Sequence, residues 1–200
     1  MCTRGSNRAL LGAPSTSPLG IMKRLLFAVL CLFFTLAGAQ EGWIDPKGHA
    51  VPDTPAQKSV HGFGGWLLVT SDADWEAKWN APSETTPHFA EAKEVPRGRR
   101  IFVLIFLANP QLTADGTVDV TCDIDVTRPN GTTSTHDTDT VCFRGTLKGD
   151  PHHTYLSDPV IGFAGDPGDP VGEWQVRVIL KDNVRHVSIP LRTSFVLLDQ

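Results

Sequence analysis

Five aspartates in one short region carry side chains of the kind that bind calcium. Asp119, Asp123 and Asp125 alternate with apolar residues between 118 and 127, so they are expected to share the exposed face of one strand. Asp137 and Asp139 follow the next turn and lie on or beside the hairpin partner of that strand. Calcium sites in extracellular modules use clustered carboxylates. The alternative, which we favour, is a charged sheet face that stays hydrated and discourages edge pairing, so we predict no metal and no cofactor.

The histidines and hydroxyl residues do not form a catalytic motif in the sequence. His152 and His153 are adjacent, and neighbours in an extended strand point to opposite faces. His136 lies in a polar stretch whose spacing matches neither a zinc motif nor an EF-hand loop. No G-x-S-x-G nucleophile elbow is present. We therefore predict no catalytic residue, although a glycosidase carboxylate pair would be defined by distance in space and not by spacing.

Tryptophans are the second group of candidate functional residues. Trp66 and Trp174 lie in strand-like runs and are expected in the core. Trp75 and Trp79 are one helical turn apart and would face the same side of a short helix. They are either the residues that pack this helix onto the domain or anchors for a protein partner or a sugar ring. We retain both as candidate partner contacts.

Two cysteines, Cys122 and Cys142, remain once an expected leader is removed. In an exported chain such a pair most often forms a disulfide, and closing a loop of this length stabilises by about 3 kcal/mol in the chain-entropy model. The alternative is a pair of buried free thiols. No C-x-x-C redox motif is present, so the predicted bond is structural.

The first 39 residues predict export. Residues 22–39 combine a basic start, an apolar run of about 13 residues and the small residues before a cleavage site after Ala39. Residues 1–21 are interpreted as a mis-assigned start or a long basic region. Without residues 1–39 the chain keeps 14 of its 18 Lys and Arg and all 22 Asp and Glu, so its charge changes from −4 to 14 − 22 = −8. This charge disfavours nucleic acid as a partner, and after cleavage no membrane span is expected.

Strand patterns dominate the remaining chain. Residues 40–60 predict an extended lead-in, and residues 61–200 one β domain. Alternation of apolar and polar residues predicts strands over 118–127, 172–182 and 187–197, while the apolar run 101–107 predicts a strand covered on both faces. Residues 63–70 predict a further strand and 72–80 a short helix with a capping box. Asn130-Gly131 and Asp182-Asn183 predict hairpin turns.

The last third of the chain resembles a known architecture. The pattern Gly172-x-Trp174-x-Val176-x-Val178 up to Asp182, with an alternating terminal strand, resembles the closing hairpin of bacterial immunoglobulin-like and fibronectin-III-like domains. Residues 118–131 resemble an interior strand and turn of the same domains. The resemblance implies a mostly β, antiparallel immunoglobulin-like sandwich of about seven strands with one short helix. The cysteines lie too close together for the usual inter-sheet bridge, so no functional residue is carried over.

An exported β domain without a catalytic motif predicts a non-enzymatic binding or accessory module of the cell envelope, in the periplasm or secreted. Its partner would be another exported protein or an envelope component. Two other classes remain open. One is a small cell-envelope hydrolase with a site around residues 137–153. The other is an inhibitor or structural partner that binds an exported protein through a sheet edge.

Overall fold

The computed structural model describes residues 42–44, 47–82 and 87–199. The chain divides into two units, Met1–Ala39 and Gln40–Gln200, and all the described residues belong to the second. The predicted signal segment therefore lies outside the described residues. Among the residues described, no helix is long and apolar enough to cross a membrane.

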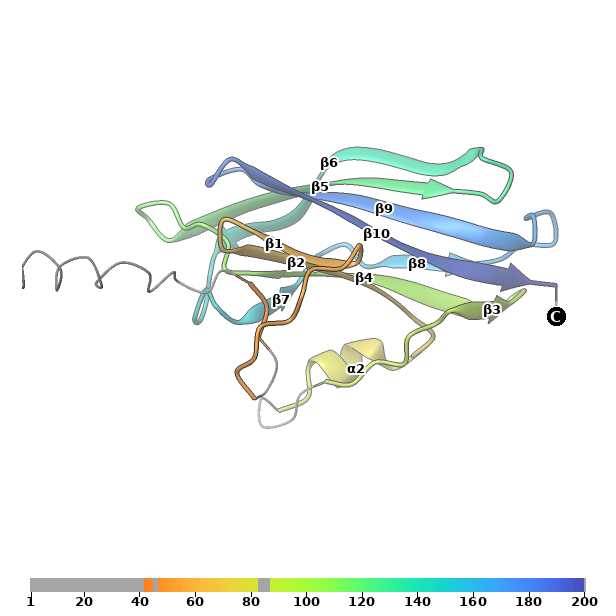
Figure 1. Ribbon diagram of the computed structural model, residues 1–200, viewed down its shortest axis with the longest axis horizontal. Helices are drawn as coiled ribbons and strands as arrows, with labels where there is room; N and C mark the ends of the chain where they lie inside the picture. Colours follow the sequence, from red (N-terminus) through yellow and green to blue (C-terminus); the bar gives the residue numbers. More distant parts are fainter. Residues whose placement is uncertain (1–41, 45–46, 83–86, 200) are drawn as a thin grey trace, which may run out of the picture. The chain divides into compact units, whose positions relative to one another are not determined.

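The domain is mostly β and consists of two layered sheets (Figure 1). One sheet contains β1 (Gln57–Val60), β2 (Phe63–Thr70) and β4 (Arg100–Ala108) in that order. Both β7 (Thr154–Leu156) and β8 (Ile161–Ala164) pair with the remaining edge of β4, at its opposite ends. The other sheet runs β3 (Glu94–Pro96), β10 (Val187–Leu198), β9 (Gly172–Asp182), β5 (Thr117–Thr127) and β6 (Thr133–Thr146). All pairings are antiparallel except β3 with β10.

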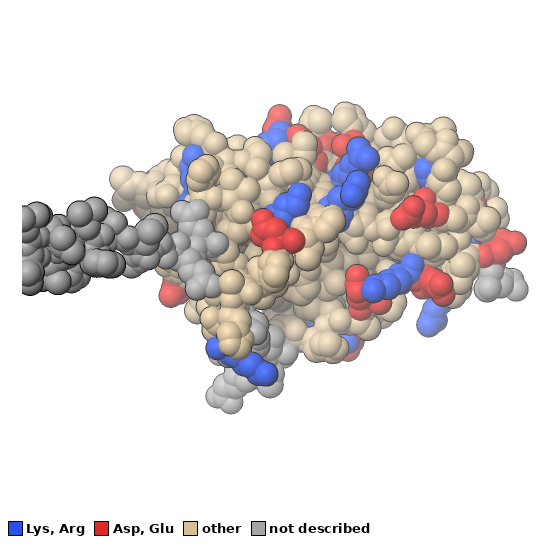
Figure 2. Space-filling view, viewed as in Figure 1, with Lys and Arg blue, Asp and Glu red and all other residues tan. Residues whose placement is uncertain are grey.

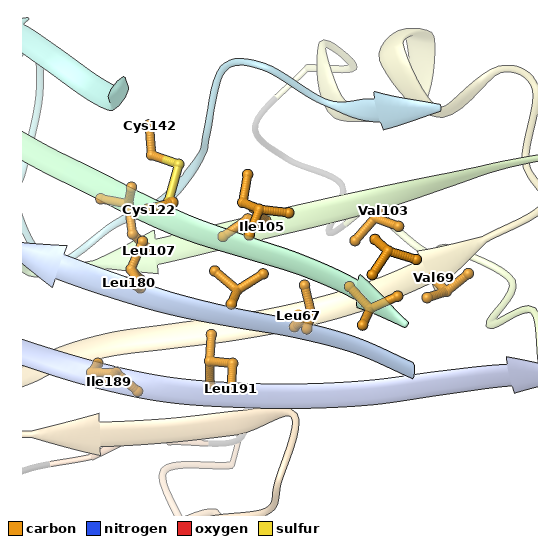
Figure 3. Packing of buried hydrophobic residues seen from close by; sticks show 14 of the residues in the cluster. Leu67, Val69, Val103, Ile105, Leu107, Cys122, Cys142, Leu180, Ile189 and Leu191 are labelled. Carbon is orange, nitrogen blue, oxygen red and sulfur yellow. A yellow bond between two sulfur atoms is a disulfide. The ribbon is translucent and has the colours of Figure 1, made fainter. Parts of the chain in front are cut away.

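Side-chain alternation builds the core between the sheets. Inward residues of β2 and β4, such as Leu67 and Ile105, meet inward residues of the second sheet, such as Leu180 and Leu191 (Figure 3). Trp174 on β9 is fully buried and lies against Phe163 and Phe195. The predicted strands over 118–127, 172–182 and 187–197 are confirmed, and so are the two hairpins that connect β5 to β6 and β9 to β10.

The prediction that β4 is covered on both faces is also confirmed. Its inward residues join the main core, while Leu104 and Phe106 belong to a second cluster on the outer face of the first sheet. The helix α2 (Trp75–Trp79) and Phe89 cover that face. The apolar run of this strand is therefore buried on both faces, by the second sheet on one side and by the helix and Phe89 on the other.

Three sequence expectations are corrected. The described residues contain ten strands instead of about seven, because β1, β3, β7 and β8 are short segments that gain hydrogen bonds from longer neighbours. Residues 57–60 belong to a strand and not to an extended lead-in. The helix begins at Trp75, and its N-cap Asp74 makes no side-chain capping bond. The Asp74 carboxylate instead lies 3.4 Å from Lys78 Nζ.

Candidate functional site

A shallow trough crosses the outer face of the second sheet where β9 and β10 run side by side. Inward residues of both strands are buried in the core, so the alternate residues face outward. The register of the hairpin places the outward residues in four successive cross-strand pairs: Ile179 with Pro190, Arg177 with Arg192, Gln175 with Ser194, and Glu173 with Val196. Along the strands, the trough therefore changes from apolar to basic, then to neutral polar, then to acidic.

The trough consists of two adjoining hollows that share Pro55 and Arg192. One has a volume of ≈ 670 Å³, and its lining includes the arginine pair, Ile179, Pro190, Lys58 and the two acidic residues Asp53 and Asp125. The other has a volume of ≈ 590 Å³ and extends over Gln175 and Ser194 to Glu91 and Lys93. The segment before β1 forms a wall, because the Arg192 amide donates a hydrogen bond of 2.7 Å to the Pro55 carbonyl.

The two arginines of the trough lie directly opposite each other. Because the Arg192 amide points away from β9, the Arg177–Arg192 pair is of the non-hydrogen-bonded type, in which side chains come closest. Neither guanidinium has a carboxylate within ion-pair distance among the described residues. Like charges directly across a sheet are destabilising. The pair is therefore a site where an anion would be favourable.

One carboxylate close in register to this pair is already engaged elsewhere. Asp125 on β5 is directly opposite Arg177 on β9, but its Oδ1 lies 2.6 Å from Nδ1 of His136 on β6. The hydrogen bond to Asp125 is the main cause that raises the pKa of His136 above its ordinary value of 6.5. Protonated His136 therefore competes with Arg177 for this carboxylate.

The edge of β10 is open beside the second hollow. Arg192 and Val196 donate their amides to the carbonyls of Pro55 and Lys93, so these two groups point away from β9. Ser194 lies midway, and the alternation of an antiparallel strand directs its N–H and C=O to the same edge. No backbone partner for either group occurs among the described residues outside the regular strands. This position offers one donor and one acceptor to a ligand.

The five candidate calcium ligands do not gather into one site. Asp119 pairs with Arg144 at 2.7 Å, and Lys181 bridges Asp123 and Asp139 at 2.7 and 2.8 Å. Hydrogen bonding from Lys181 is the main cause that lowers the pKa of Asp123. Asp137 is paired in register with buried Ile124, so it lies on the opposite face of the sheet from Asp125. Within the described ranges, no three His, Cys, Asp or Glu residues gather as metal ligands do.

The disulfide between Cys122 and Cys142 is formed, and its α-carbons are 5.9 Å apart. Both cysteines are buried, and they join the neighbouring strands β5 and β6 (Figure 3). The bond closes its covalent loop within one sheet and does not link the two layers. It therefore links the edge strand β6 covalently to its neighbour β5.

Trp75 and Trp79 pack inward from α2. Their rings lie 5.9 Å from Phe102 and 5.4 Å from Phe106, measured between ring centroids. Trp66 stacks on the same Phe106 at 4.8 Å and is only partly buried, whereas Trp174 is fully buried. The two helix tryptophans thus have a packing role, and their use as partner contacts stays a prediction.

Two histidines in or beside the region considered for the hydrolase alternative lie in separate places. His136 pairs with Asp125, while His152 Nδ1 lies 2.8 Å from the Asp150 carboxylate in the loop before β7. Neither pair contacts a serine, threonine or cysteine side chain in any hydrogen bond of the described residues. Neither of these two His–Asp pairs therefore activates a nucleophile of the kind that a hydrolase would need.

Sequence reasoning missed Arg177 and Arg192. Each is a single charge in an alternating strand, and such residues are usually solvated surface groups. The signal that identifies them is the hairpin register: Asp182 opposite Val187 fixes Arg177 opposite Arg192. Basic and acidic side chains are interspersed on the face seen in Figure 2, so that face carries no large patch of a single charge. An anion site therefore has to be identified from the positions of individual residues.

Comparisons with known proteins give only distant similarities. No family model matches, and no curated protein matches. One similar solved structure is a family 123 glycoside hydrolase from Clostridium perfringens, with 10% identity and a TM-score of 0.38 over 68% of this chain and 28% of that one. A FixG-related protein from Vibrio parahaemolyticus has 10% identity and a TM-score of 0.35 over 69% of this chain and 98% of that one.

A third similar structure is the Pseudomonas fluorescens alkylpurine DNA glycosylase AlkC bound to DNA with an abasic site analog, with 13% identity and a TM-score of 0.31 over 52% of this chain and 27% of that one. The chain thus spans less than a third of the glycoside hydrolase and of the glycosylase. These similarities assign the chain to no family.

Proposed function

We propose that this protein is an exported, non-enzymatic binding module of the cell envelope, and that the β9–β10 trough binds a ligand bearing a carboxylate. The observation that carries the proposal is the Arg177–Arg192 pair, which faces outward, lies directly across two strands and has no carboxylate partner among the described residues. Guanidinium groups bind carboxylates with two parallel hydrogen bonds, and two of them surround such a group.

We include in this proposal an immunoglobulin-like fold for the domain. In variable-type immunoglobulin domains the last two strands form a hairpin. The inner strand of this hairpin pairs with an earlier strand, and that earlier strand pairs in turn with the strand that follows it in the chain. The order β10, β9, β5, β6 follows the same pattern. Buried Trp174 and the cysteines differ from antibody domains, because here the disulfide joins neighbouring strands of one sheet. Such folds support many functions, so the trough and not the fold is the argument for binding.

Binding of carboxylate polymers tests the proposal directly. Polyglutamate and polygalacturonate would be titrated into the domain by isothermal titration calorimetry at low salt. We expect binding that weakens with salt and falls at least tenfold when Arg177 and Arg192 are both changed to Gln. Arg100→Gln is the matched control, because Arg100 is an exposed arginine on β4 in the other sheet. Absence of binding to both polymers, or equal binding by the double variant, would contradict the proposal.

The hydrolase alternative has its own test. Envelope polymers incubated with the protein would be assayed for release of reducing sugars or peptides. We expect no hydrolysis. Hydrolysis that disappears in His136→Ala or His153→Ala, with circular dichroism unchanged, would replace the binding function by an enzymatic one.

A further inference from the structure

We infer that the ligand of the trough is the carboxyl-terminal end of an extended peptide, an inference that rests on the proposed function and names its ligand class. Three features of the trough combine with the arginine pair to favour a peptide: an apolar shelf on one side, an open main-chain position on the other, and an acidic end beyond it. Each feature is positioned by the register of β9 and β10.

The apolar shelf adjoins the arginines. Ile179 and Pro190 form the next outward pair, and Ile179 keeps 38% of its surface exposed although it is a large apolar residue. Outward pairs on one face of an antiparallel sheet follow each other at about 7 Å along the strand. A carboxylate held by Arg177 and Arg192 therefore places the side chain of the same terminal residue on this shelf. A hydrophobic terminal residue is the match.

The open main-chain position lies on the other side of the arginines. The backbone N–H and C=O of Ser194 point to the edge between Pro55 and Lys93. The side-chain carboxamide of Gln175 is on the outer face beside them. A peptide backbone supplies the complementary acceptor and donor, as it does when an extended segment pairs with a sheet edge. Ring-stacking sites for a sugar are missing from the described lining, where the one aromatic residue, Phe195, is buried.

The acidic end gives the peptide a direction. Glu173 is four residues from Arg177 along β9, about 14 Å in an extended strand. Glu91 also lines this hollow, and its partner Lys93 is 3.4 Å away at an exposed position. A peptide that ends at the arginines and runs over Ser194 thus brings a residue three or four positions before its end close to Glu173. A lysine or arginine at that point is favoured by charge.

Matched peptides test the inference. Fluorescein-labelled Gly-Lys-Ala-Ala-Leu with a free carboxyl end would be titrated with the full domain by fluorescence anisotropy, beside the same peptide with an amidated end. We expect the amidated peptide to bind at least tenfold more weakly. The difference should disappear in Arg177→Gln/Arg192→Gln and persist in Arg100→Gln. Arg177→Lys keeps the charge and the fold but not the bidentate geometry, and it should lower the affinity for the free-carboxyl peptide severalfold.

A second set of peptides tests the direction. Replacing the lysine by glutamate should weaken binding to the unaltered domain, and Glu173→Lys should reverse this preference. Replacing the terminal leucine by glycine should weaken binding through loss of the apolar contact with Ile179.

The outcomes separate the inference from the proposed function. If free-carboxyl and amidated peptides bind equally while polygalacturonate binds through the arginine pair, the peptide inference is overturned and carboxylate binding stands, with an acidic polysaccharide as the ligand. If neither peptide nor carboxylate polymer binds, both are overturned. Preference for the free carboxyl end that depends on both arginines supports the inference.

Discussion

At the scale of single residues, the outer face of the second sheet is organised by competition for carboxylates. Lys181 holds Asp123 and Asp139, Arg144 holds Asp119, and His136 holds Asp125. The sequence shows that these aspartates share a region, but their cationic partners are up to 58 residues away along the chain. That distance is why the local pattern favoured a charged face over a calcium site but could not identify the cationic partners of these aspartates.

The His136–Asp125 pair predicts a pH dependence. Because the folded pKa of His136 is raised above 6.5, its stabilisation is fully present below about pH 6.5 and is lost as pH rises through the raised value. Two-dimensional NMR of the imidazole should show a midpoint above 6.5. In Asp125→Asn the midpoint should return toward 6.5, since the hydrogen bond to the carboxylate is its main cause. An unchanged midpoint in that variant would contradict the assignment of the cause.

At the scale of elements, one buried carboxylate holds the hairpin that positions the arginine pair. Asp182 is 1% exposed at the end of β9, where it accepts hydrogen bonds from the amides of Val184 and Arg185 in the turn. Its other oxygen accepts the amide of Gln111 at 2.8 Å. The turn around Asp182-Asn183 could be predicted from sequence, but the role of this side chain could not, because Gln111 belongs to a distant loop.

Asp182→Ala should therefore destabilise the domain. Removing the carboxylate leaves three backbone donors without their acceptor, and an unsatisfied buried group costs roughly 1–3 kcal/mol. The free energy of unfolding, measured in urea by tryptophan fluorescence, should fall by at least that amount. Asp137→Ala, at an exposed position on β6, is the control and should change it little. Equal stability of the two variants would show that the turn holds without Asp182.

At the scale of the whole domain, the two sheets approach closely at glycines. A Cβ atom on Gly165, just after β8, would lie 2.6 Å from Cδ1 of Leu197 on β10. A Cβ on Gly162, within β8, would meet nothing within 4 Å. The glycines of this region look alike in sequence, and only the opposite sheet distinguishes them.

This difference predicts unequal effects of two alanine substitutions. Gly165→Ala should reduce the free energy of unfolding by about 1–3 kcal/mol, the typical cost of overpacking. Gly162→Ala should be close to neutral, since its position is open. Thermal unfolding of both variants beside the unaltered domain measures the contrast, and a neutral Gly165→Ala would mean that the sheets separate more easily than this contact indicates.

Export is a property of the whole chain that stays a prediction. Cleavage after Ala39 would release a protein that begins at Gln40 and carries a charge of −8. Mass spectrometry of the protein recovered from the envelope or the medium of an exporting host should give this N-terminus. Recovery of a chain that still contains residues 22–39 would contradict cleavage.

The sequence by itself determined the strands with a two-residue period, the strand covered on both faces, the hairpin turns and the cysteine pair. These features depend on residues that are neighbours along the chain or share one local pattern. The tertiary structure decided which strands form each sheet, that the helix tryptophans pack on β4, and that Arg177 faces Arg192 without a carboxylate partner among the described residues. Those facts depend on strand register and on contacts between distant segments. A charged side chain is available to bind a ligand only if the residues that lie beside it in space do not already pair with it, and the local sequence does not say which residues those are.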